Sequence, residues 1–467
     1  MNRKGVAVAA LLGTLGLPLY GQASEYAEIS RQAEQQARWG SLGAAIAAYR
    51  QVLANPDLEA SHNTARLRLA RLYLDSFDYP AARSELAQLI ATAPDSEEAK
   101  QARKLQRKAA SKTKAHSYGG KIQFAMIHDT DTANASSGSP VSEPSFNDDD
   151  DEDLDDEDGD FDEDDDFADA DFDDDLLEDV DLDEDDLDEE EGLDGGEDEE
   201  GADDDADADA GDTATPAKPK RSVHDNRRQA SAALRYSYGL NERGDRWNLA
   251  GNFSQARQDD QDTLNRETIA LSTGPVFLVP DWRLKVNPSV TYLQLYKDHC
   301  YDVSSTIWSL GVSHKLNRVL ELGVRYNYEN RDLNSENSPD VEIDTLKFSV
   351  KFKPTSHDSF DLSYSPKVED NDQRKKDKDQ GGWKVAYARK LPWDSFAGIA
   401  YTRRHTDYGN DPKGKEEDED KYALTLGHKL TKDLLVAVSY EHKEKDSNQV
   451  GKDKNNESTS LSLSYRF

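Results

Sequence analysis

The sequence has little that could cross-link the chain or anchor it in a membrane by helices. Cys300 is the single cysteine in 467 residues. It excludes an internal disulfide, and such scarcity fits an exported chain that avoids stray thiols. Hydrophobic residues are 35% of the chain and the mean hydropathy is −0.90, which is too polar for an ordinary helical membrane protein. After Leu19 no apolar run is long enough for a transmembrane helix, so a membrane-embedded form has to cross with strands.

The acidity of the chain is concentrated in one segment. Residues 148–212 hold about 43 of the 95 acidic residues, and without them the formal net charge of −38 becomes about +5. Like-charge repulsion and sparse apolar residues predict that residues 130–226 form a long disordered insertion. It acts either as a solvating brush or as a surface for a basic or amphipathic partner, and both interpretations stay open. The negative charge disfavours nucleic acid as a partner.

The acidic segment contains no defined metal site. No spacing in it matches a calcium-binding loop, so we expect no specific metal and no cofactor. At this charge density we do expect diffuse binding of divalent cations, by side chains such as those of Asp148, Asp149, Asp150, Asp164, Asp165 and Asp166.

Residues 1–23 have the layout of a signal peptide. Two basic residues precede the apolar run Gly5–Leu19, and a short polar stretch leads to Ala23. This layout predicts cleavage after Ala23 and export from the cytoplasm. A membrane anchor is the alternative, but the run is short and is broken by Pro18.

Residues 24–114 change to a helical apolar period and predict a small all-α domain. One set of positions follows the layout of a tetratricopeptide repeat: Trp39, Leu42, Gly43, Tyr49 and Pro56. A looser copy runs from Leu67 to Pro94, and a plain helical hairpin bundle is the alternative. Two repeats are few for a free-standing array, so we expect this domain to pack against another part of the protein.

Residues 115–467 alternate between apolar and polar positions, as β-strands do. The last ten residues are the clearest case, since serines and one arginine alternate with the outward series Leu461, Leu463, Tyr465 and Phe467. That ending predicts the signal read by the machinery that assembles outer-membrane barrels. Thirteen such runs follow the acidic segment, and Ser117–His128 before it supplies another. We therefore predict an all-β transmembrane barrel of about 14 antiparallel strands, with residues 130–226 as its first extracellular loop.

The links between the expected strands alternate in length. Short links such as Asn241–Asp245 and Leu430–Asp433 alternate with longer charged links such as Glu329–Asp340 and His405–Lys421. Short turns on one side and long loops on the other are typical of the periplasmic and extracellular ends of a barrel. One expected exception is a longer link over Gly274–Asp281 on the short side.

The combination of parts resembles the surface lipoprotein assembly modifier family. The residues that carry the resemblance are the repeat that begins at Trp39, the segment Gly120–Asn134 and the ending Tyr465–Phe467. The resemblance implies a periplasmic tetratricopeptide-like domain joined to a fourteen-strand barrel that helps proteins or lipoproteins cross the outer membrane. This chain departs from the family at Asp131, where asparagine is common, and in its large acidic loop.

No arrangement of residues points to an enzyme. The ten histidines are scattered without a partnered serine, cysteine or glutamate at a recognisable spacing. The predicted function is therefore an outer-membrane channel for protein export, with an exported protein or lipoprotein, membrane lipid and the barrel-assembly machinery as partners. A polysaccharide-export barrel and a passive porin or surface protein with a functional acidic loop are the alternatives.

Overall fold

The computed structural model describes residues 18–39, 41–130, 225–259, 265–297, 300–333, 340–371, 377–449 and 453–467. The helices are α1 Pro18–Trp39, α2 Leu42–Ala54, η1 Pro56–Ser61, α3 His62–Asp75, α4 Tyr79–Thr92 and α5 Glu97–Lys112, with a short η7 Pro280–Trp282. The strands are β1 His116–Asp129, β2 Asp225–Gly239, β3 Arg246–Gln258, β4 Arg266–Val279, β5 Leu284–Lys297, β6 Cys300–Lys315, β7 Leu320–Leu333, β8 Val341–Phe352, β9 Asp358–Asn371, β10 Lys378–Leu391, β11 Ser395–Asp407, β12 Glu416–Lys429, β13 Leu434–Ser447 and β14 Lys454–Arg466.

The strands form one closed antiparallel barrel. Each strand pairs with its neighbours in sequence, and β1 closes the ring by pairing with β14 as well as with β2. This confirms the predicted fold class of about 14 strands, including the strand expected over Ser117–His128. Closure removes the free sheet edge, so every strand has a partner on both sides.

Alternation along each strand separates the two faces of the barrel wall. On β1 the side chains of Phe124 and Met126 point outward and are 57% and 64% exposed, whereas Gln123 and Ala125, which alternate with them, are buried. On β14 Leu461 and Leu463 are exposed while Ser462 and Ser464, which alternate with them, are buried. Period-two patterning therefore puts large apolar side chains outside and small or polar ones inside.

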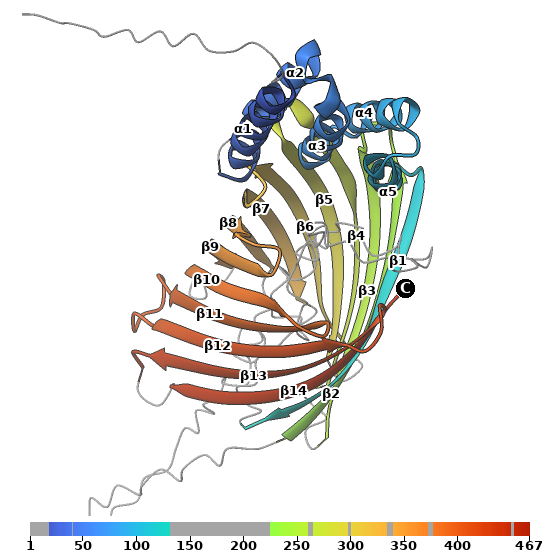
Figure 1. Ribbon diagram of the computed structural model, residues 1–467. Coiled ribbons are helices and arrows are strands. Elements are labelled where there is room, and N and C mark those ends of the chain that lie inside the picture. Colours follow the sequence, from blue (N-terminus) through green and yellow to red (C-terminus); the bar gives the residue numbers. More distant parts are fainter. Residues whose placement is uncertain are drawn as a thin grey trace, which may run out of the picture.

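The two ends of the barrel differ. The helices lie over one end, which we call the helical end (Figure 1). Links at this end are short: 240–245, 280–283, 316–319, 353–357, 392–394 and 430–433. The tightest of them, residues 392–394, places Trp393 and Asp394 at φ 60° and 51°, in the left-handed region that tight hairpin turns use. At the opposite end, the far end, the strands extend further than predicted, so the expected link His405–Lys421 shrinks to residues 408–415.

The predicted longer link over Gly274–Asp281 is wrong. Strand β4 continues to Val279, and only a single turn, η7, separates it from β5. Gly274 and Pro275 are common in turns, and this suggested a link. Here Gly274 instead lets two backbones approach closely, because a Cβ on it would lie 2.2 Å from the Pro288 carbonyl oxygen.

The helices pack into a domain with its own apolar core. Leu42, Tyr49 and Leu72 are at most 1% exposed and belong to one cluster, and Leu67, Leu86 and Leu89 belong to a second. Side-chain N-caps begin two of the helices: Asp78 accepts from the Ala81 amide at the start of α4, and Ser96 accepts from the Ala99 amide at the start of α5. The helical domain therefore has a compact apolar core, while the inner wall of the barrel mixes polar and charged side chains with buried apolar ones such as Leu295 and Ile343.

Candidate transport path

An ion-pair cluster joins the helical domain to the barrel. Asp75, the last residue of α3, accepts a 2.6 Å hydrogen bond from Arg318 Nε in the β6–β7 link, and Lys315 Nζ lies 3.8 Å away. Burial would raise the pKa of Asp75, but Arg318 and Lys315 outweigh it and hold that pKa below its ordinary value. The Arg318 amide also donates to the Ala37 carbonyl of α1, at 3.1 Å. One turn of the barrel is thus bound by two helices.

Apolar contacts hold the domain on either side of this cluster. Tyr79 at the start of α4 forms a buried cluster with Val276 and Leu278 of β4. Gly244 in the β2–β3 link meets the same ring, because a Cβ on it would lie 2.8 Å from Tyr79 Cε2. On the other side the rings of Trp39 and Phe352 are 6.3 Å apart. The contacts of the domain thus reach from the β2–β3 link to the end of β8 (Figure 1).

A cavity of about 390 Å³ opens where the helical domain meets the barrel. Its wall includes Tyr49, Arg68, Arg71, Glu98 and Gln101 from the helices and Arg318 from the barrel. The size is at the low end for a small-molecule or peptide site, and charged side chains from both parts lie in its wall together with apolar ones such as Leu67 and Leu72.

Hydrogen bonds fix the polar wall of this cavity. Arg68 Nη1 donates to Ser30 Oγ at 2.5 Å and also binds Glu34 and the Tyr49 hydroxyl. Burial raises the pKa of Tyr49, so its hydroxyl stays protonated and can donate. Arg71 donates to Gln101 Oε1 at 3.3 Å. Burial and the nearby cations Arg318 and Arg68 lower the pKa of Arg71.

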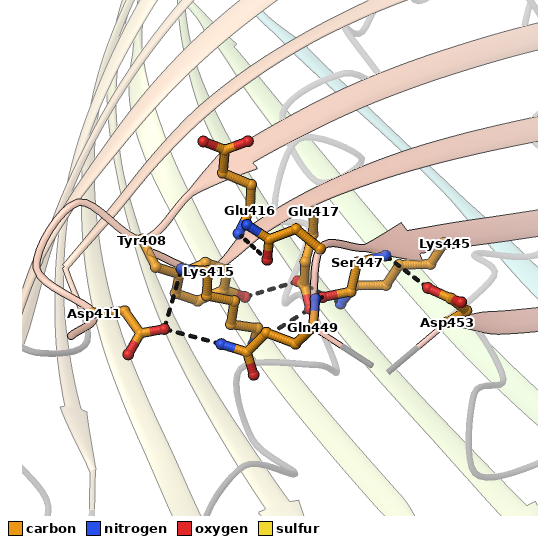
Figure 2. Close-up of polar contacts among 10 residues, drawn as sticks. Tyr408, Asp411, Lys415, Glu416, Glu417, Lys445, Ser447, Gln449 and Asp453 are labelled. Carbon is orange, nitrogen blue, oxygen red and sulfur yellow. Dashed lines mark hydrogen bonds and ion pairs between the residues drawn. The ribbon is translucent and has the colours of Figure 1, made fainter. Parts of the chain in front are cut away.

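Inside the far end of the barrel, charged side chains of β12 and β13 form a far-end ladder. Its pairs are Lys445–Glu417 at 2.9 Å, Lys443–Glu419 at 3.1 Å and Lys421–Glu441 at 2.9 Å. Figure 2 shows its outermost part, where Glu417 accepts from the Tyr408 hydroxyl at 2.9 Å and Lys415 Nζ lies 3.3 Å from Glu417. Asp411 then accepts from the Lys415 amide and from Gln449, so the β11–β12 and β13–β14 links are tied together.

The outer surface of the barrel is apolar and rich in aromatic residues. Trp308, Tyr364 and Leu424 are between 45% and 57% exposed. Aromatic rings also contact one another across strands, as do Tyr401 and Tyr422 with centroids 4.9 Å apart. An exposed apolar wall of this extent needs lipid around it, and a closed barrel is the strand structure that satisfies every backbone group in lipid. The barrel is of the outer-membrane type.

The predicted site residues are found in different places. Leu461, Leu463, Tyr465 and Phe467 all lie on the outer face, with exposed fractions of 51%, 41%, 46% and 51%. The tetratricopeptide-like motif is divided between helices: Trp39 ends α1, Leu42 and Gly43 begin α2, Tyr49 is buried in α2, and Pro56 begins η1. Its assignment as a tetratricopeptide repeat stays a prediction. The six aspartates expected to bind cations diffusely lie outside the described residues.

Sequence reasoning missed the contacts between the two parts. Asp75 and Arg318 are 243 positions apart, and neither belongs to a motif. A basic residue at the tip of a short barrel link was a weak signal. Among the residues that the structure describes, no group of three His, Cys, Asp or Glu side chains is placed to hold a metal. No helix of the described part is long and apolar enough to cross a membrane.

Comparison with known proteins yields solved barrels only. No family model and no curated protein matches the chain. OmpT, an outer membrane protein of Vibrio cholerae, is 12% identical, with 54% of this chain and 94% of that chain covered and a TM-score of 0.33. An anion-selective porin from Comamonas acidovorans is 6% identical, with 75% and 99% covered and a TM-score of 0.36. OpdQ of Pseudomonas aeruginosa is 9% identical, with 76% and 99% covered and a TM-score of 0.32.

Proposed function

We propose that the protein is an outer-membrane channel that helps exported proteins or lipoproteins cross the membrane. The helical domain is periplasmic in this proposal and receives the substrate, and residues 131–224 form an extracellular loop. The observation that carries the proposal is the seating of the helical domain on the barrel links, through Asp75 and Arg318, with a polar cavity at the junction. A domain that only tethered the barrel would need no such cavity beside its opening.

A second candidate is a porin for small solutes. The inner wall favours it, because serines, asparagines and ion pairs occupy many of its buried positions, beside apolar side chains such as Leu295. Such a wall suits water and dissolved solutes.

The export proposal can be tested by breaking the junction. Asp75→Arg places a cation against Arg318 and Lys315, and like charges repel. We therefore expect the helical domain to detach from the β6–β7 link while the barrel still assembles. Surface biotinylation of intact cells should then show at least one exported protein depleted from the surface, with its total cellular amount unchanged. Asp57→Arg is the matched control, since Asp57 is exposed on the same domain. Unchanged surface proteins in cells with a correctly assembled Asp75→Arg barrel would contradict the export proposal.

A further inference from the structure

The charges in the wall of the junction cavity are balanced. The cavity is lined by three arginines and three glutamates, which are Arg68, Arg71, Arg318, Glu34, Glu97 and Glu98. The wall as a whole therefore favours neither anions nor cations. What the cavity can bind depends on which of these side chains already have a partner of opposite charge.

Four of the six charged side chains are neutralised by neighbours. The ion pairs are Arg68–Glu34, Arg318–Asp75 at 2.6 Å and Glu97–Lys100 at 2.9 Å. These pairs hold the wall in place, and they leave one cation and one carboxylate, Arg71 and Glu98.

Arg71 and Glu98 have uncharged hydrogen-bond partners. Arg71 donates to Gln101 Oε1 at 3.3 Å, and Glu98 accepts from Thr64 Oγ1 at 3.2 Å. Both residues are half-buried, and among the residues that the structure describes neither forms an ion pair. The cavity thus holds two opposite charges that the protein itself does not pair.

These two side chains have unused hydrogen-bonding capacity. A guanidinium has several N–H donors and a carboxylate has several acceptor positions, and one hydrogen bond occupies each here. Asp75, a carboxylate that acts electrostatically on Arg71, is already bound by Arg318. A ligand with a carboxylate for Arg71 and an ammonium or guanidinium for Glu98 would make charge-assisted hydrogen bonds with both.

The helices fix the order of the two binding groups along the cavity. Arg71 on α3 is one turn from Asp75, the residue that meets the barrel, so Arg71 lies on the barrel side. Arg71 lies two turns beyond Thr64, and Gln101 lies one turn beyond Glu98, so the two contacts are about 5–10 Å apart. Side chains two positions apart on an extended peptide lie on one side and are spaced by about 7 Å, which fits this separation.

We propose that Arg71 and Glu98 bind a dipolar segment of the exported polypeptide, in which an acidic and a basic side chain lie two positions apart. The acidic side chain binds Arg71 on the barrel side of the cavity, and the basic side chain binds Glu98 on the side away from the barrel. The inference rests on the export function proposed above and adds the kind of segment that the helical domain receives.

Binding of four short labelled peptides to the purified full-length protein, measured by fluorescence anisotropy, tests the proposal. In a glycine–serine background the peptides carry lysine and glutamate two positions apart, lysine and glutamine, glutamine and glutamate, or two glutamines. The parent protein should bind the lysine–glutamate peptide at least about tenfold more tightly than each peptide that lacks one charge. The lysine–glutamine peptide also measures any attraction of lysine to residues 148–212, which are the same in every variant.

Substitutions in the cavity decide which residue binds which charge. Arg71→Gln should weaken binding of the lysine–glutamate peptide at least about tenfold and leave binding of the lysine–glutamine peptide unchanged. Glu98→Gln should weaken binding of the lysine–glutamate peptide equally and leave binding of the glutamine–glutamate peptide unchanged. Arg83→Gln/Glu59→Gln is the matched control, because it removes one exposed charge of each sign elsewhere on the same domain.

Equal binding of all four peptides by the parent protein overturns the proposal, and this result does not depend on whether any variant folds. Stronger binding of a short-chain phosphatidylethanolamine than of the lysine–glutamate peptide, in competition, also overturns it and identifies a zwitterionic lipid headgroup as the ligand. The Asp75→Arg test of export is a separate measurement. Depleted surface proteins in that variant, together with equal binding of the four peptides, would retain the export proposal and overturn this one alone.

Discussion

The ring of Phe467 lies on Gly120 at the seam where the barrel closes. The Gly120 amide donates to the Phe467 carbonyl at 2.8 Å, and the Phe467 amide donates back to the Gly120 carbonyl at 3.1 Å. A Cβ on Gly120 would lie 2.4 Å from Cζ of the Phe467 ring. The terminal aromatic residue thus has two roles here, as the end of the outer apolar stripe and as the last pair of the β1–β14 seam.

Gly120→Ala should therefore weaken the seam. The added methyl group has to displace the Phe467 ring or push β1 from β14, at a cost of about 1–3 kcal/mol typical of overpacking. We expect a smaller fraction of the protein to migrate as the compact form on unheated gels, and a lower urea midpoint. Gly251→Ala on β3 is the control, since nothing lies within 4 Å of its added Cβ.

Deleting Phe467 should prevent assembly more completely than Gly120→Ala does. The deletion removes the outer aromatic side chain together with both backbone hydrogen bonds at the seam. Outer-membrane fractions of the deletion strain should lack the heat-modifiable form. Normal assembly without Phe467 would show that closure depends on the remaining β1–β14 pairs alone.

Asp75→Asn should loosen the helical domain without affecting the barrel. The folded state holds the pKa of Asp75 below its ordinary value of about 4, so its ion pair contributes stability above that value and loses it as pH falls through the lowered pKa. Removing one partner of the ion pair should lower the free energy that holds the helical domain on the barrel by about 1–3 kcal/mol. Hydrogen exchange at the end of α3 and in the β6–β7 link should be faster in the variant at pH 7, and the difference should shrink at strongly acidic pH. An equal effect of Asp57→Asn would argue against a specific role for the pair.

Glu417→Gln should release the β11–β12 link at the far end. Glu417 is 6% exposed and accepts from Tyr408 while lying near two lysines, so its loss leaves both cations without that carboxylate. The variant should lose about 1–3 kcal/mol of the free energy that holds the β11–β12 link in place. Because the link then opens more often, trypsin should cut after Lys413 or Lys415 more rapidly. Glu416→Gln is the neighbouring control, because Glu416 is exposed and its backbone makes its hydrogen bonds with Asn448.

An epitope inserted near Gly195 should be labelled on intact cells. β1 ends at Asp129 and β2 begins at Asp225, both at the end opposite the helical domain. If the helical domain is periplasmic, the chain between them emerges outside, where external protease should cut it first. Labelling that needs a permeabilised outer membrane would reverse the predicted sidedness.

Local periodicity was enough to predict the barrel. Alternation at Leu461, Leu463 and Tyr465 identifies the outer face, because a strand turns successive side chains to opposite sides whatever its partners are. The same rule identified Ser117–His128 as a strand ahead of the acidic segment. It failed at Gly274, where a residue common in turns serves a close approach between β4 and β5 that depends on the partner strand.

Pairing across the barrel had to come from the tertiary structure. Register decides that Lys121 faces Arg466 and that Arg325 faces Lys347, and register depends on how all strands close together. The hydrogen bond between Arg318 and Asp75 likewise depends on where the helical domain packs against a barrel link that is distant in the sequence. The sequence by itself determined the strands and their apolar face, since these follow from neighbouring residues. Only closure of the barrel decided which charges meet in the lumen, because charge pairing is a property of distance in space.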